Sequence, residues 1–184
     1  MSKIAIVYFS GYGHTVKIAE AIAASAGASL VQIDAEGNLP EGGWDKLNDA
    51  DMIVFGSPTY MGMATWQFKK FADASSKVWF TQGWKNKLFA GFTNSASLNG
   101  DKASTLSYFS TLAMQHGGLW VGTGMLPSNS KAATRADINN LGASVGLMTA
   151  TPSDASTDEM VAGDLATAAK FGERLAEVAK AVKG

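Results

Sequence analysis

Short apolar runs alternate with segments of helical spacing along this chain. The first run, Ile4 to Phe9, is unbroken and rich in β-branched and aromatic residues, which is typical of a strand buried on both faces of a parallel sheet. From Val16 to Ala26 the apolar residues recur three or four positions apart, while Lys17 and Glu20 face water. The chain therefore opens with a predicted strand that leads directly into a helix.

The same alternation continues to the end of the chain. Further strands are predicted at residues 29–33, 52–55, 88–92 and 119–121. Helical segments are predicted at 44–49, 65–78, 102–115 and 156–182, with Thr65 as an N-cap and with Ser156 and Glu159 as a capping box. Because consecutive parallel strands are joined by right-handed crossovers, residues 1–184 should form one α/β domain. We expect a three-layer, doubly wound α/β/α sandwich with a five-stranded parallel sheet.

Residues 127–152 show no clear periodicity. Val145 to Ala150 are apolar enough to resume or extend the last strand after an insertion. The sequence assigns no role to this region.

The turn between the first strand and the first helix, Ser10 to Thr15, holds two glycines, two hydroxyls, a tyrosine and a histidine. Such a turn directs free backbone N–H groups and the positive end of the helix dipole at one point, where an anion is stabilised. It lacks the Lys followed by Ser or Thr of a nucleoside-triphosphate loop. A phosphate cradle of another kind is indicated.

Two kinds of ligand fit such a cradle. Gly11 and Gly13 supply the first two glycines of the dinucleotide fingerprint, but Val16 stands at the third, so a dinucleotide remains an alternative with Asp34 as its ribose-binding acid. The hydroxyls of Ser10 and Thr15 suit a terminal phosphomonoester better, because its three oxygens need several donors. A mononucleotide such as FMN fits best.

Two later loops should meet this turn. Residues 57–63 follow the third strand and 94–99 follow the fourth, and both are rich in hydroxyl, amide, glycine or aromatic groups. In doubly wound sheets, ligands bind outside the carboxyl ends of the strands. One site built from three loops is expected.

Composition restricts the function further. The formal net charge is −1 and neither sign clusters, which argues against a nucleic-acid partner. There is no cysteine, and the two histidines are far apart, so neither a thiolate site nor a zinc site is expected, and the metal prediction is none. Redox chemistry would need a bound organic cofactor. With no room for a signal peptide and no apolar run of membrane-spanning length, a cytoplasmic protein without a membrane span is expected.

Taken together, the loops resemble the flavodoxin-like superfamily, and within it the WrbA-type NAD(P)H:quinone oxidoreductases and NADPH-dependent FMN reductases. The resemblance covers most of the chain and rests on YFSGYGHT, FGSPTYMG, VW, FTNSAS and LAMQHG. It implies a flavodoxin-like fold and non-covalent FMN. In departure from the family, the insertion ahead of the third strand is short, and GLMTATPSD replaces a GGDGS-like segment that in relatives takes part in subunit contacts and site closure.

The resemblance also implies roles for individual residues. The first loop would hold the FMN phosphate, the second would line the isoalloxazine, and the third would wrap its pyrimidine edge. His116 matches a flavin-contacting histidine, Tyr12 a nicotinamide-contacting tyrosine, and Trp79 a tryptophan that covers the substrate site in the family's tetramers. The implied cofactor contacts are Ser10, Gly11, Tyr12, Gly13, His14, Thr15, Pro58, Thr59, Tyr60, Met61, Gly62, Asn94, Ser95, Ala96, Ser97, Leu98, Asn99 and His116.

Each aromatic or titratable candidate also has a structural explanation. His14 could donate within its own turn, and His116 could be a cation at the C-terminal end of its helix. Tyr12, Tyr60 and Trp79 could be buried against a partner subunit, and Trp84 is expected to pack in the core.

The function expected from the resemblance is hydride transfer from NAD(P)H through FMN to a quinone or similar acceptor, in a homodimer or homotetramer. FMN would do the chemistry, with no catalytic side chain beyond assistance from His116. The alternative is a flavodoxin-type electron carrier without its own nicotinamide activity, although the near-neutral charge is unusual for such carriers. A cofactor-free interaction module is a third possibility.

Overall fold

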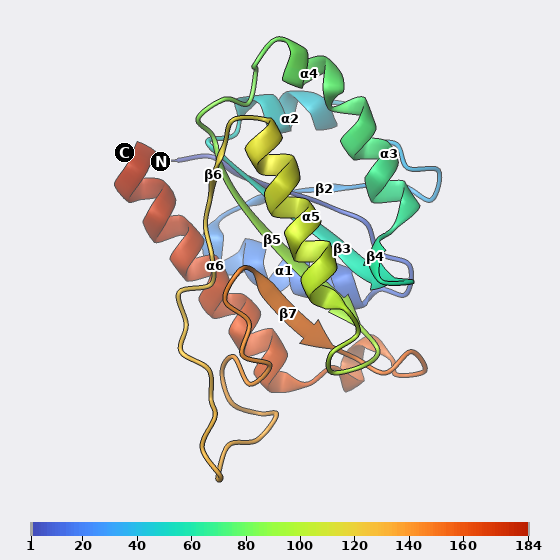
Figure 1. Ribbon diagram of the computed structural model, residues 1–184, viewed down its shortest axis with the longest axis vertical. Coiled ribbons are helices and arrows are strands. Elements are labelled where there is room, and N and C mark those ends of the chain that lie inside the picture. The colour runs from blue at the N-terminus through green and yellow to red at the C-terminus, as the bar shows by residue number, and fades with distance from the viewer. Residues whose placement is uncertain (1, 184) are drawn as a thin grey trace.

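A parallel sheet runs through the molecule in the strand order β2-β1-β3-β5-β6 (Figure 1). The structure is a computed structural model that describes residues 2–183. The order places the first strand inside the sheet and reverses the winding direction between β1 and β3, as expected for a doubly wound fold. The five strands on this path are β1 (Ile4–Tyr8), β2 (Ser29–Gln32), β3 (Met52–Tyr60), β5 (Leu88–Ser95) and β6 (Leu119–Trp120).

Helices cover both faces of the sheet (Figure 1). One face packs against α1 (His14–Ala26) and α6 (Ala162–Lys183). The other packs against α2 (Gly43–Asp49), α3 (Trp66–Ala74), the short α4 (Ser76–Phe80) and α5 (Lys102–Gln115). The predicted three-layer α/β/α arrangement is confirmed.

The two cores explain why the first strand carries no polar residue. Ile4, Ile6 and Tyr8 of β1 belong to the core under α1 and α6. Ala5 and Val7 point to the opposite face and join the second core. Since successive side chains of a strand point to opposite faces, a strand covered on both sides must be apolar throughout.

The third strand is longer than predicted. It continues to Tyr60, turns through Met61 and Gly62 at φ values of 49° and 82°, and pairs antiparallel with β4 (Met63–Ala64). The expected loop at 57–63 is therefore mostly a hairpin. A Cβ on Gly56 would lie 2.3 Å from the ring of Phe92, so this glycine allows close packing within a strand.

The fifth position of the sheet is shared by two strands. β6 pairs with the start of β5, and β7 (Leu147–Ala150) pairs with its end, both in parallel register. Between them, residues 121–146 leave the sheet edge and return to it. The prediction that residues 145–150 resume the last strand is confirmed for residues 147–150. Within residues 2–183 the sheet thus has seven strands, β4 and β7 included, rather than the predicted five.

Two predicted helices are divided, although their caps are correct. The Thr65 hydroxyl accepts a hydrogen bond from the Phe68 N–H at 3.4 Å, but the helix breaks at Ser75, between α3 and α4. Ser156 and Glu159 form the predicted capping box on a 3₁₀ turn, η1 (Thr157–Glu159), and α6 begins only at Ala162.

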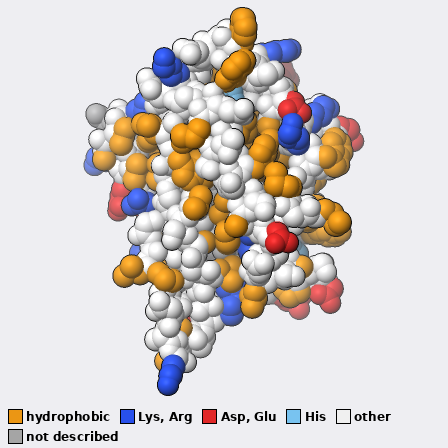
Figure 2. Space-filling model, viewed as in Figure 1, with side chains coloured by type: hydrophobic (Ala, Val, Ile, Leu, Met, Phe, Trp, Pro, Cys, Tyr) orange, Lys and Arg blue, Asp and Glu red, His pale blue; other side chains and the backbone are white. Residues whose placement is uncertain are grey.

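Charged side chains are scattered over the face shown in Figure 2 rather than gathered into one patch. No helix within residues 2–183 is long and apolar enough to cross a membrane.

Candidate cofactor site

The corner after β1 leaves its backbone donors open. Gly13 precedes α1 with φ 89° and makes no side-chain cap, and its N–H donates to the Ser10 hydroxyl at 3.1 Å. The first N–H groups of a helix have no partner within the helix, so those at the start of α1 are free to bind an anion. Thr15, which is buried, lines the small cleft in front of them. This donor set fits a phosphate.

Two tyrosines border the cleft. The Tyr60 hydroxyl lies so close to Gly11 that a Cβ there would come within 2.7 Å of it. Tyr12 meets the Tyr60 ring edge-on at 6.1 Å between centroids, and it is 67% exposed. Burial, with a smaller contribution from Tyr12, raises the pKa of Tyr60, so its phenol is neutral at pH 7. The pair offers aromatic surface and a hydroxyl at the open side of the cleft.

A fourth loop, residues 151–157, closes the cleft from the other side. The Thr151 N–H donates to the Ser95 carbonyl at 3.1 Å, and the ring Nε2 of His14 lies 2.8 Å from the Ala155 carbonyl oxygen. The methyl group of Thr157 lies 3.0 Å from the position that a Cβ of Gly13 would occupy. The first four residues of this loop end the GLMTATPSD segment, which replaces the family's GGDGS-like segment, and none of them is among the site residues expected from the sequence.

Hydrogen bonds from Thr149, Thr151 and Lys102 fix the start of the third loop, residues 94–99. The Asn94 amide oxygen accepts hydrogen bonds from Thr149 at 2.8 Å and Thr151 at 3.1 Å. The ammonium of Lys102, at the first position of α5, donates to the Ser95 hydroxyl at 2.7 Å. Burial lowers the pKa of Lys102 to about 8, so it is mostly charged at pH 7. Lys102 was not predicted as a site residue, because a lysine in a first helical turn normally faces water.

The cleft between these four loops has a volume of about 50 Å³. That volume suits a phosphate rather than a three-ring flavin, so the ring of a bound FMN would lie at the open side, beside the two tyrosines. The cleft is lined by Tyr12, His14, Thr15, Pro58, Tyr60, Asn94, Ser95, Ala96, Thr151 and Ser153. Eight of these ten residues belong to the set expected from the sequence, and Thr151 and Ser153 do not.

Some expected residues of the second loop do not reach the cleft. The hydroxyl of Thr59 points into the protein, where it lies 2.8 Å from both the Thr93 and Thr105 hydroxyls. It joins β3, β5 and α5 instead of lining the cleft. Met61 is fully exposed at the tip of the hairpin, next to Gly62.

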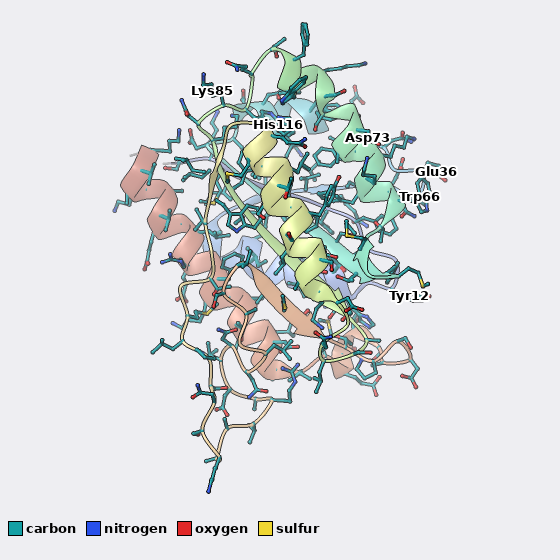
Figure 3. The ribbon with its side chains drawn as sticks, in the orientation of Figure 1. Tyr12, Glu36, Trp66, Asp73, Lys85 and His116 are labelled. Carbon is teal, nitrogen blue, oxygen red and sulfur yellow. The ribbon has the colours of Figure 1, made fainter. Side chains whose placement is uncertain are left out.

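His116 and Trp79 lie away from this cluster. Figure 3 shows His116 at the end of α5 opposite to the corner that carries Tyr12. There His116, Trp79 and Ser75 line a separate cavity of about 390 Å³. The expectation that His116 contacts the flavin and assists its chemistry stays a prediction, and within one chain α5 carries this residue to the end of the sheet opposite to the cleft.

His116 is well packed at this second position. Its ring contacts Trp84 at 4.6 Å between centroids, and its Nε2 lies 2.9 Å from the Ser75 hydroxyl. That hydroxyl also donates to the Ala72 carbonyl at 2.6 Å, so the imidazole Nε2–H is the donor in the pair. Nδ1 is buried and has no hydrogen-bond partner among the described residues. Trp84 is fully buried and packs in the core, as predicted.

The buried imidazole should make the protein sensitive to acid. Burial lowers the pKa of His116, so the unfolded chain takes up this proton more readily than the folded one. The free energy of unfolding should fall as the pH drops below about 6.5, with a contribution of at most about 1.4 kcal/mol per pH unit. Urea denaturation between pH 7.5 and 5 should show a smaller decline for H116Q, which keeps a donor for Ser75. Equal slopes would contradict this assignment.

Within the described chain, no three His, Asp or Glu side chains lie close enough together to hold a metal ion.

Comparison with known proteins shows which family the chain belongs to. Residues 5–113 match the family model described as a flavodoxin domain. The chain belongs to the flavodoxin family. Flavodoxin FldP of Pseudomonas aeruginosa is 57% identical over 178 residues, which cover 97% of both chains. The chain is also 28% identical, over the full length of both proteins, to an NAD(P)H dehydrogenase (quinone) of Methanosarcina acetivorans.

Solved structures agree with this assignment. A flavodoxin, WrbA-like protein from Agrobacterium tumefaciens aligns over 100% of both chains with a TM-score of 0.83 and 51% identity. A flavodoxin from the domain Archaea aligns over 97% of this chain and 99% of its own with a TM-score of 0.63 and 20% identity, which supports the fold alone. The resemblance and the flavodoxin-like fold inferred from the sequence are confirmed.

Proposed function

We propose that this protein is a flavodoxin-type electron carrier that binds FMN without a covalent link. The observation that carries the proposal is the corner at residues 10–15, whose free donors face a cleft of phosphate size beside two tyrosines. Ser10 and Thr15 would bind the phosphate, Pro58 and Tyr60 would line the ring, and residues 94–99 would hold its pyrimidine edge. Bound FMN supplies the electron-accepting chemistry, and the chain positions the ring and limits its contact with water.

The carrier is favoured over an enzyme by two observations. The relative that is 57% identical is named a flavodoxin, whereas two relatives named NAD(P)H dehydrogenase (quinone) are only 30% and 28% identical. Within one chain, His14 is the histidine that lines the cleft, and its Nε2 already lies 2.8 Å from a backbone carbonyl. A carrier needs no proton-transferring side chain there. The formal charge of −1 then implies weak electrostatic steering of its redox partners.

The second candidate is an NAD(P)H:quinone oxidoreductase, the function that the family resemblance of the sequence implies. Relatives named NAD(P)H dehydrogenase (quinone) support it. In this candidate Trp79 and His116 would act at the FMN of a second copy. The family resemblance implies that Trp79 covers the substrate site in the family's tetramers. Trp79 and Phe80 are 52% and 83% exposed, and apolar side chains project where Figure 1 places α4 (Figure 2). A homodimer or homotetramer is part of this candidate, and so is Tyr12 as the nicotinamide contact.

One experiment separates the two candidates. The FMN-loaded protein is mixed with NADH or NADPH and a quinone, and nicotinamide oxidation is followed at 340 nm, with sedimentation at the same concentrations. The carrier should oxidise nicotinamide no faster than free FMN, yet after reduction by dithionite it should pass electrons to ferric cytochrome c. Multiple turnovers with quinone, lost in W79A, would instead establish the oxidoreductase. A chain that binds no FMN would exclude both.

A further inference from the structure

Lys102 is a fully buried lysine at the base of the third loop, and its side chain is 0% exposed. Its ammonium donates to the Ser95 hydroxyl at 2.7 Å, the Ser97 carbonyl at 2.7 Å and the Leu98 carbonyl at 2.9 Å. The three ammonium protons are thus satisfied, and every acceptor belongs to the 94–99 loop.

No carboxylate neutralises this charge at close range. Among the described residues, no Asp or Glu oxygen lies within 4 Å of the Lys102 ammonium. Asp164 attracts it from farther away, but Asp164 is itself paired with Arg135 at 2.6 Å, and Arg135 repels the ammonium. Burying a lysine without an ion pair costs free energy, so a purely structural role would be served better by a neutral donor.

A tight turn at Gly100 and Asp101 joins the 94–99 loop to α5 and places Lys102 beneath the loop. Gly100 and Asp101 both adopt left-handed conformations, with φ values of 53° and 52°. This conformation is unfavourable for a residue with a side chain, although Asp tolerates it better than most. A Cβ on Gly100 would lie 2.0 Å from the Ser95 hydroxyl, so the turn tolerates only glycine at that position.

The contacts also fix which way the loop peptides point. In a trans peptide the C=O and N–H groups point in opposite directions. Because the Ser97 and Leu98 carbonyls face Lys102, the N–H groups of Leu98 and Asn99 face away from it. Neither N–H donates to an acceptor within residues 2–183, so both are free to bind a ligand.

We propose that Lys102 is a positioning residue that directs these N–H groups at the pyrimidine edge of FMN and, through its buried charge, strengthens binding of the reduced cofactor relative to the oxidised one. The proposal rests on FMN occupying the cleft. Reduction of free FMN by two electrons and one proton leaves one negative charge on the pyrimidine side of the ring. Two N–H dipoles directed at that edge, and a buried cation on the other side of the loop that carries them, stabilise the charge.

The test compares K102M with the unsubstituted protein, both loaded with FMN. The two-electron midpoint potential is measured anaerobically against a reference dye, and the affinity for oxidised FMN is measured by fluorescence. K102M should weaken binding of reduced FMN at least tenfold more than binding of oxidised FMN, which corresponds to a potential about 30 mV more negative. K102Q, which keeps two donors without the charge, should show the same direction of shift.

Lys87 provides a matched control. It is half-buried just before β5, at the opposite end of that strand, and its ammonium donates to the Asn48 carbonyl at 2.7 Å. K87M should leave the midpoint potential unchanged. Should K102M not fold, the comparison is made with K102Q.

Three outcomes would count against the account in different ways. Equal loss of affinity for both redox forms in K102M, or complete loss of FMN from both Lys102 variants, would show that the lysine only braces the loop. An unshifted potential in K102Q would show that the charge is not used. Failure of the unsubstituted protein to bind FMN would instead contradict the proposed function.

Discussion

T15D should weaken FMN binding by about three orders of magnitude while leaving the protein folded. Thr15 lies in the first turn of α1 and lines the cleft at the free N–H groups. A carboxylate there would occupy the anion site and repel the phosphate, which costs about 4 kcal/mol for two unit charges ~4 Å apart at an effective dielectric constant of ~20. The same carboxylate at a helix N-terminus stabilises the helix by about 0.3–1 kcal/mol, so the fold should persist.

Two controls isolate the charge effect. T15V removes only one hydroxyl and should weaken FMN by about 1–2 kcal/mol through a lost phosphate hydrogen bond. Riboflavin, which lacks the phosphate, should bind T15D and the unsubstituted protein with similar affinity. Fluorescence titration of the apo-protein with both flavins measures these values. Unchanged FMN affinity in T15D would mean that the phosphate binds elsewhere.

F55A should reduce the free energy of unfolding by about 3–5 kcal/mol. Phe55 lies at the centre of the second core and is 0% exposed. Its ring contacts those of Phe89, Phe68 and Phe109, with centroids 5.3, 5.7 and 5.9 Å away. Truncation removes these contacts and leaves a cavity between β3, α3 and α5 that the surrounding rings cannot fill without leaving their rotamers.

The same substitution at an exposed phenylalanine provides the control. Phe80 at the end of α4 is 83% exposed, so F80A should change stability by no more than about 0.5 kcal/mol. Urea denaturation of both variants at pH 7.5 gives the comparison. Similar losses in the two variants would mean that Phe55 does not lie in the second core.

The elements that the sequence predicted well are those in which local spacing and tertiary packing agree. β1 and α1 are examples, since an apolar run and a helical stripe lead directly to their faces in the two cores. β3 was cut short because the residues that follow Phe55, starting with Gly56, read as a turn. In the structure Gly56 gives the Phe92 ring room to pack, and parallel pairing with β5 continues through Pro58.

The site was predictable where one loop carries its own signal. The corner at 10–15 has such a signal, because free helix donors and hydroxyls follow one another in the chain. Lys102 and Thr151 had none. Their roles depend on segments distant in sequence meeting at one sheet edge, and a lysine or a threonine in either segment reads as an ordinary surface residue. For His116 the family motif in the sequence suggested a place in the site. In the structure, however, its helix ends at the other end of the strands, away from the cleft.

The central claim is that the corner after β1 holds the phosphate of FMN. The most direct test is the ratio of the affinities of the unsubstituted apo-protein for FMN and for riboflavin, measured by calorimetry in one buffer. Several charge-assisted hydrogen bonds to the phosphate should be worth about 3 kcal/mol or more, so FMN should bind at least about 100-fold more tightly. Equal affinities for the two flavins would contradict the account.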